Sequence, residues 1–221
     1  MSFVNHGMLG MYAFTGPRTW WTFANSSNSS ASTITLPSDV QSDDLIVLVQ
    51  VGNAGSNPPA VVTPSGYTAL GSGSSSNTNQ QIAACYKVST GGDASAVLTG
   101  IAGGTGNRKV AMIFRPTPRT TVGVSNGSVI AGSTSGNPGA TVIDSGNVST
   151  PVIAISGWAC ETSAPTGTFS PTEDATLNGA ATGALNLQVK YKIMNYNPAN
   201  VTADMNDLSL NSTISFYMAM A

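Results

Sequence analysis

The sequence predicts an all-β protein, an antiparallel β-sandwich assembled from two similar halves. Three observations predict this class: many short runs typical of strands are separated by turn residues, helical periodicity is nearly absent, and the pattern recurs once along the chain. The chain has 221 residues, of which 41% are hydrophobic and only 8% are charged. This composition is typical of a β protein with a real core and a surface of hydroxyls and amides.

The predicted strands are alternating or continuous apolar runs, each bounded by turn chemistry. In chain order they are Thr19–Phe23, Ser32–Leu36, Leu45–Val51, Tyr67–Leu70, Gln80–Val88, Ala94–Leu98, Lys109–Arg115, Thr120–Val124, Gly139–Ile143, Pro151–Ala159, Ala184–Ile193, Asn200–Met205 and Ser212–Ala219. The intervening segments favour turns or loops, namely Pro64–Gly66, Thr90–Asp93, Asn126–Gly127 and Gly132–Gly139. Strands this short and closely spaced favour a sandwich or barrel over a parallel α/β sheet.

The two halves of the chain repeat five elements in the same order. The first half contains Ile46–Val49, Pro64–Tyr67, Ala84–Val88, Ala94–Leu98 and Lys109–Phe114; the second contains Val152–Ile155, Pro165–Thr168, Gln188–Ile193, Asn200–Ala203 and Thr213–Met218. The offset is about 105 residues throughout, and the length differences fall in predicted loops. Chance similarity in a β chain of low complexity is the alternative. We predict pseudo-repeat halves at about 33–118 and 139–221, facing each other as two layers of a single sandwich, residues 18–221.

Residues 1–17 precede the predicted sandwich and differ from it in composition. Their large apolar side chains are Phe3, Val4, Met8, Leu9, Met11, Tyr12 and Phe14. An apolar segment without a strand or helix partner either folds back over the sandwich or docks onto another chain, and we predict an N-terminal docking arm. The Ser- and Asn-rich stretch Asn25–Ser32 is predicted to be a loop that serves as a hinge.

Charge and cysteine content exclude several classes of protein. The formal net charge is −2, so the composition does not predict a basic surface for binding nucleic acid. No run approaches the roughly 20 apolar residues of a membrane span. The N-terminus lacks the features of a secretory signal, so we expect synthesis in a host cytoplasm. Cys85 and Cys160 are too few for a disulfide scaffold or a zinc site, and two free buried thiols are favoured over a pair.

Catalytic and metal-binding candidates are sparse, and we expect no enzyme activity, cofactor or metal. The only histidine is His6, in the arm. A glycosidase would need two facing carboxylates, for which Glu161 with Glu173 or Asp174 is the one pairing to consider; solvated loop charges are the alternative. The oxygen-rich stretches around Asp43–Asp44 and Asp204–Asp207 suit Ca²⁺, but acidic residues also end strands and protect sheet edges.

Aromatic side chains ringed by hydroxyls and amides suit the faces of sugars. The candidate glycan contacts are Trp20, Trp21 and Trp158, with Tyr67 as a further aromatic. Packing in the core is the alternative for each of them. If Trp20 and Trp21 lie in a strand, they point to opposite faces, so at least one belongs to the core.

Several of these segments resemble the jelly-roll domains of tailed-bacteriophage virion proteins. The resemblance lies in Thr33–Pro37, Asp43–Val49, Pro64–Leu70, Tyr86–Val88 and Ala111–Pro116, and it extends over Thr33–Ala221. It implies a jelly-roll-like sandwich, although Tyr67 stands where such domains usually have Trp after Ser-Gly. The motifs describe how strands begin, turn and end, so no site residues carry over.

The function we expect from these observations is that of a non-enzymatic structural protein of a phage virion. It would be displayed on the particle surface as a capsid decoration or cement protein or as a tail component, contacting other proteins of the capsid or tail lattice. We expect a homo-oligomer on the particle. A host-receptor or glycan-binding tail adhesin is the alternative, and a polysaccharide hydrolase is a third hypothesis.

Overall fold

The computed structural model describes residues 19–53, 61–74, 80–99, 106–121, 123–134, 139–146, 150–160, 167–179, 185–196, 198–205 and 211–221. The strands are β1 (Trp20–Ser29), β2 (Ile34–Thr35), β3 (Leu45–Asn53), β4 (Thr68–Ser74), β5 (Gln80–Val88), β6 (Val97–Leu98), β7 (Gly106–Thr117), β8 (Val124–Thr134), β9 (Gly139–Ile143), β10 (Val152–Cys160), β11 (Gly167–Ser170), β12 (Ala175–Asn178), β13 (Asn186–Met194), β14 (Val201–Met205) and β15 (Asn211–Met220). Over these ranges no helix is long and apolar enough to cross a membrane.

The strands form two large and two small antiparallel sheets. The first large sheet has the order β1-β7-β3-β5-β4, and the second has the order β8-β15-β10-β13-β12. The first small sheet pairs β2 with β6, and the second small sheet has the order β9-β14-β11. The predicted all-β antiparallel sandwich is confirmed.

The strand order of the first half recurs in the second half. In the large sheets β1, β3, β4, β5 and β7 correspond to β8, β10, β12, β13 and β15, and in the small sheets β2 and β6 correspond to β9 and β14. β11 has no counterpart among the described strands of the first half. The repeat includes β1 and β8, which begin before the stretches in which the sequence similarity was noticed.

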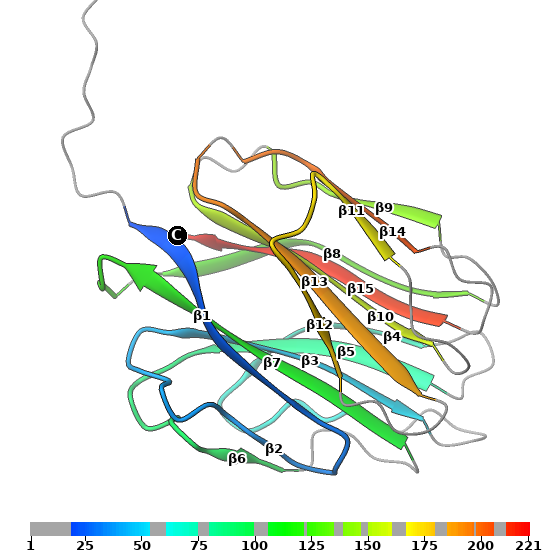
Figure 1. The fold of residues 1–221 in the computed structure, drawn as a ribbon, viewed down its shortest axis with the longest axis horizontal. Helices are drawn as coiled ribbons and strands as arrows, with labels where there is room; N and C mark the ends of the chain where they lie inside the picture. Colours follow the sequence, from blue (N-terminus) through cyan, green and yellow to red (C-terminus); the bar gives the residue numbers. More distant parts are fainter. Residues whose placement is uncertain are drawn as a thin grey trace, which may run out of the picture.

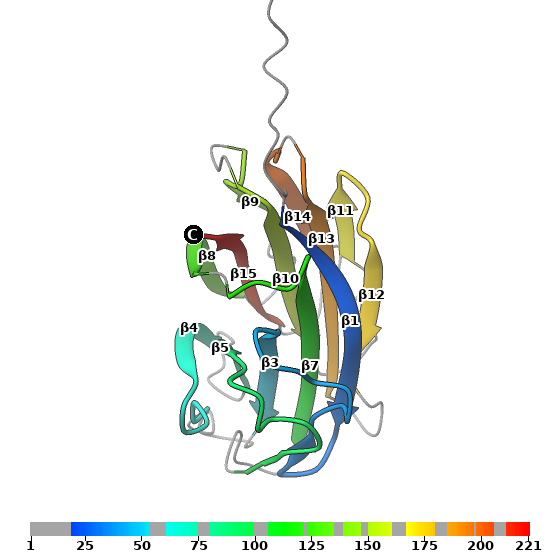
Figure 2. The same ribbon diagram turned by 90° about the vertical axis from the view of Figure 1, so that its left-hand side faces the viewer.

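The four sheets stack as four layers (Figures 1 and 2). The two large sheets face each other across a central core, and each small sheet covers the outer face of the large sheet of its own half. The expectation of two layers is therefore wrong in number, although the two halves do face each other. The reason lies in the continuous apolar runs: Leu45, Val47 and Val49 enter the central core, whereas Ile46 and Leu48 pack under the first small sheet. A strand buried on both faces needs a layer on each side.

The central core is shared between the halves. Tyr191 of β13 stacks on Phe23 of β1 with ring centroids 5.1 Å apart, and its ring meets that of Phe114 of β7 edge to face at 5.2 Å. Near the middle of the interface, a Cβ atom added to Gly157 of β10 would lie 2.9 Å from Val49 Cγ1 of β3. Glycine at 157 thus lets the two large sheets approach closely.

Residues typical of turns and loops lie inside two strands, β1 and β8. The stretch Asn25–Ser29 continues β1 past a bulge at Ala24, so the predicted hinge is wrong over those residues. The predicted strand Thr120–Val124 is also wrong, because β8 begins at Val124 and runs through Asn126–Gly127, where a turn was expected. A bulge lies beside Gly127, and a Cβ atom there would lie 2.3 Å from the hydroxyl oxygen of Tyr217, so the residues typical of a turn serve a bulged strand.

Strand pairing gives the sandwich two distinct ends. At the terminal end, Trp20 pairs with Thr117, Val124 pairs with Met220, and the chain finishes at Ala221. At the loop end, Asn53 pairs with both Gln80 and Gly106, and Cys160 pairs with Asn186 and Asn211. The segments 75–79, 161–166 and 206–210, which connect strands at the loop end, lie outside the described residues.

Candidate functional site

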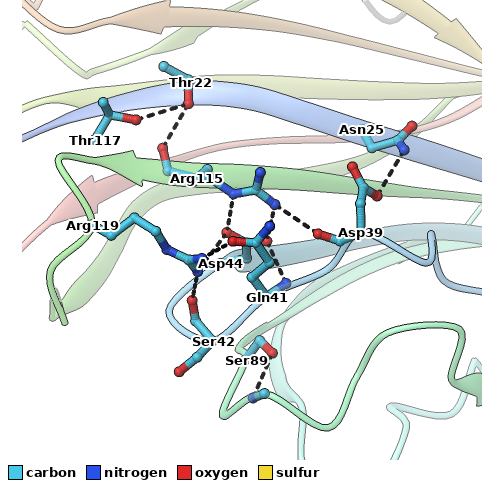
Figure 3. A network of polar contacts seen from close by, with 11 residues as sticks. Thr22, Asn25, Asp39, Gln41, Ser42, Asp44, Ser89, Arg115, Thr117 and Arg119 are labelled. Atoms are coloured by element: carbon cyan, nitrogen blue, oxygen red, sulfur yellow. Dashed lines mark hydrogen bonds and ion pairs between the residues drawn. The ribbon is translucent and has the colours of Figure 1, made fainter.

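Among the described residues, the largest network of charged side chains is centred on Asp44, at the terminal end (Figure 3). Asp44 is fully buried and precedes β3 directly. Arg115 Nε donates to Asp44 Oδ1 at 2.9 Å, and Arg115 Nη2 donates to Oδ2 at 2.8 Å, which is a two-pronged contact. The backbone N–H of Gln41 donates to Oδ2 at 2.9 Å, and Arg119 Nη2 lies 3.7 Å from Oδ1.

The same network fastens the segment before β3 to β7 and β1. Arg115 Nη2 also donates to the carbonyl oxygen of Asp39 at 2.9 Å, and Asn25 Nδ2 of β1 donates to Asp39 Oδ1 at 2.9 Å. Arg119 reaches Gln41 Oε1 and the carbonyl oxygen of Ser42. The hydrogen bond that Arg115 donates to Asp44 raises the pKa of Arg115, so this guanidinium stays charged. With both carboxylate oxygens engaged, Asp44 has a structural role and is not placed to act as a general base.

The calcium hypothesis finds no assembled site in the part of the chain that the structure describes. Asp44 holds arginine rather than a metal ion, and Asp204 lies in β14. Within the described ranges no group of three or more metal-binding side chains comes together. Asp207 lies outside the described residues.

The carboxylates considered for glycoside hydrolysis are paired with lysines. Glu173 Oε1 contacts Lys190 Nζ, and Asp174 Oδ1 accepts from Lys192 Nζ at 2.7 Å. Burial, the largest single cause, raises the pKa of Glu173, but the hydrogen bonds from Lys190, a backbone group and Thr176 and the charge of Lys190 together outweigh it, so the net pKa is lowered. A carboxyl group with a lowered pKa is a poor general acid at neutral pH. Glu161 lies outside the described residues.

Two of the three tryptophans proposed as glycan contacts are core residues. Trp21 is 1% exposed and belongs to the central core, and Trp158 is 2% exposed and packs edge to face on Phe169 under the second small sheet. Neither indole ring can reach a ligand, so these two assignments are wrong. Trp20 is half-buried at the start of β1, and Tyr67 packs against the core beneath the first small sheet.

Cys85 and Cys160 are both buried and form no disulfide, as expected. Cys85 lies under the first small sheet and Cys160 under the second, so the two large sheets separate them. Burial raises the pKa of the Cys85 thiol to about 12. A thiol that stays protonated at neutral pH is a poor nucleophile.

Arg108 and Lys109, which the sequence analysis did not single out, are the two bases without an ion-pair partner in the described part of the chain. Lys87, Arg115, Arg119, Lys190 and Lys192 all form ion pairs. Arg108 and Lys109 are nevertheless buried, 3% and 0% exposed, near the start of β7. Lys109 Nζ donates to the carbonyl oxygen of Ala31, and burial, with the neighbouring Arg108 charge, lowers the pKa of Lys109 to about 8. A sequence signal did exist: two adjacent bases continue directly into an apolar strand.

The predicted docking residues Phe3, Val4, Met8, Leu9, Met11, Tyr12 and Phe14 lie outside the described residues. No protein-family model, curated protein or solved structure matches the chain. The arrangement of strands and charged groups therefore carries the functional argument.

Proposed function

We propose that this protein is a non-enzymatic structural component of a tailed-phage virion, displayed on the particle surface as a capsid decoration or as part of the tail. The observation that carries the proposal is the order of the strands. Counted from β8, the second half places its strands in the orders 1-8-3-6-5 and 2-7-4. An eight-stranded jelly roll has the orders 1-8-3-6 and 2-7-4-5, and jelly rolls are common in viral capsid proteins.

One strand departs from the jelly-roll order in each half. β12 pairs with β13 of the large sheet instead of with β11, and β4 pairs with β5 in the same way. Because this strand pairs within the large sheet, each large sheet has five strands. The fifth strand enlarges the face that the two halves bury against each other. This strand order supports a proposal of two jelly-roll-like units that share one core.

The chemistry of the charged groups also supports a structural role. Asp44, Asp93, Glu173 and Asp174 each neutralise a lysine or arginine, and these pairs tie segments of the fold together. A protein presented in many copies on a symmetric lattice gains avidity from weak individual contacts and needs no catalytic group.

The test is to image phage particles labelled with an antibody against this protein. Label over the head would support a decoration or cement role, and label at the tail would support a tail component. Particles without label, in a preparation where the same antibody detects the free protein, would overturn the proposal. A variant lacking residues 1–17 serves as a second arm of the test: we expect it to stay folded and to lose attachment to the particle.

A further inference from the structure

β1, drawn in blue in Figure 1, is a long edge strand of the first large sheet. The other edge strands of the large sheets are β4, β8 and β12. β4 and β8 lie against each other, and β12 has only four residues, which directly follow the charged pair Glu173–Asp174. β1 has ten residues, and among the described strands of its sheet only β7 pairs with it. The edge of β1 is therefore the one at which another strand could add most easily.

The sequence of β1 lacks the residues that usually protect such an edge. Natural edge strands avoid pairing with other chains through lysine, proline, bulges or short length. The strand from Trp20 to Ser29 contains no charged residue and no proline, and it has a single bulge, at Ala24. Two copies of it could pair antiparallel about a two-fold axis without bringing like charges together. The composition of β1 thus favours self-association unless its edge is occupied.

Asparagine side chains occupy this edge. The N–H of Trp21 donates to Asn195 Oδ1, and the carbonyl oxygen of Trp21 accepts from Asn195 Nδ2. The N–H of Ser26 donates to Asn25 Oδ1 at 2.8 Å, and Asn25 Nδ2 donates to Asp39 Oδ1, which fixes the orientation of this carboxamide. A carboxamide offers the same donor and acceptor as a peptide group. It can therefore take the place of a neighbouring strand.

The second half of the chain supplies part of this protection. Asn195 directly follows β13. Farther along β1, Asn28 Nδ2 donates to the carbonyl oxygen of Asn178, the last residue of β12, at 3.3 Å. The edge of a first-half sheet is thus fastened to the second half at two points. These contacts form only when the two halves have packed together.

We propose that Asn195 and Asn25 form an edge cap, which prevents β1 from pairing with β1 of a second copy of this chain. When the cap is removed, the expected product is a two-fold dimer in which the two β1 strands run antiparallel. Such pairing would join the first large sheets of the two copies into one continuous sheet. The inference concerns the folded protein in solution, so it does not depend on the proposed function.

Sedimentation equilibrium of the full-length protein tests the edge cap. Asn195→Ala should tighten self-association by about tenfold or more, because both backbone groups of Trp21 become available to another strand. Asn195→Asp is the matched control: it also loses the donor to the carbonyl group of Trp21, but it places a charge at the edge. We expect it to associate no more than the unmodified protein. Adding Asn28→Lys to Asn195→Ala should restore the unmodified behaviour, because a lysine on an edge strand opposes pairing.

Each other outcome would overturn the edge cap. Unchanged association of Asn195→Ala would mean that the carboxamide satisfies the backbone without preventing pairing. Equal association of Asn195→Asp, or of Gly157→Ala with its clash inside the core, would mean that lost stability drives association. Association that persists with Asn28→Lys would mean that another surface is responsible. If Asn195→Ala does not fold, Asn25→Ala tests the same edge: it exposes the N–H of Ser26 and should tighten association by a smaller factor, and no change would reject the cap.

Discussion

The carboxamide of Asn195 pairs with the backbone of Trp21 as an adjacent strand would. The N–H of Trp21 donates to Asn195 Oδ1 at 2.7 Å, and Asn195 Nδ2 donates to the carbonyl oxygen of Trp21 at 2.9 Å. Opposite Trp21 on β7 stands Pro116, which has no N–H to donate. A side chain from the second half thus satisfies the edge of a sheet of the first half, where an unpaired strand invites association with other chains.

Replacing Asn195 with alanine should destabilise the protein by about 1–3 kcal/mol, because a half-buried N–H and a carbonyl group of Trp21 lose their partners. Urea denaturation followed by tryptophan fluorescence measures the change. Asn126→Ala is the control, since Asn126 is exposed on β8, and its effect should stay within about 0.5 kcal/mol. Equal effects of the two substitutions would show that the pairing contributes nothing.

Adding a methyl group at Gly157 should force the two large sheets apart. The new Cβ of Gly157→Ala would meet Val49 Cγ1 at 2.9 Å, and overpacking of this kind typically costs about 1–3 kcal/mol. Combining it with Val49→Ala removes the clashing methyl groups, so the double variant should be more stable than the sum of the single effects predicts. Strict additivity in thermal or urea unfolding would contradict the close contact.

Removing the charge of Asp44 should leave Arg115 without its partner. Asp44→Asn is expected to lower the free energy of unfolding by about 3–5 kcal/mol, the range found when one member of a buried ion pair is lost. Asp43→Asn is a matched control, because Asp43 adopts a φ of 68°, a conformation that asparagine tolerates, and makes no ion pair among the described residues. Similar losses in both variants would show that the network around Asp44 does not brace the fold.

The titration of Lys109 should increase the free energy of unfolding as the pH rises above about 8. Its pKa is lowered from 10.5 to about 8 in the folded protein, so between these values the unfolded chain holds a proton that the folded chain has released. The free energy of unfolding then increases with pH, by at most about 1.4 kcal/mol per pH unit. Cys85 and Tyr191, whose pKa values are raised to about 12, oppose this increase at higher pH.

The difference between the unmodified protein and Lys109→Met isolates the lysine, because the opposing groups are common to both. We expect the methionine variant to be the more stable at pH 7, with an advantage that shrinks from pH 8 to 10. Chemical denaturation across this range measures it. An advantage that does not change with pH would contradict a buried, titrating Lys109.

Cutting the chain between Thr117 and Thr120 should give two fragments that do not fold alone. The central core contains Phe114 and Val49 from the first half and Tyr191 and Ile155 from the second, so each isolated fragment would expose one apolar face. Circular dichroism and sedimentation of the separate fragments check this. Two monomeric fragments with cooperative unfolding would show that the halves are independent domains.

Local sequence predicted strands best where packing and pattern agree. The bounds of β5 and β9 are those expected, and the apolar runs of β3 and β10 are core strands. Prediction failed at β8, where Asn126–Gly127 has the chemistry of a turn but lies in a bulged strand against Tyr217. Pairing with a strand some 90 residues away in sequence overrides local preference there, and no short window contains that partner.

Functional candidates were recovered less completely than strands. The sequence marks Asp44 only as a possible oxygen ligand, because its partner Arg115 lies 71 positions away in the chain, near the C-terminal end of β7. Trp21 and Trp158 looked suited to sugars by residue type, yet both are buried. Residue type reveals which contacts a side chain can make, whereas exposure depends on the layers that cover it.

The all-β class and the repeated pattern of apolar runs can be predicted from the amino-acid sequence, because alternation and turn chemistry act over a few residues. The four layers, the contact of Asp44 with Arg115 and Arg119, and the completion of the edge of β1 by Asn195 emerge only when the chain has folded. These contacts join residues far apart in the chain, and their geometry depends on how whole sheets pack. The residues of a single strand therefore do not predict which distant residues it will pair with or which layer will bury it.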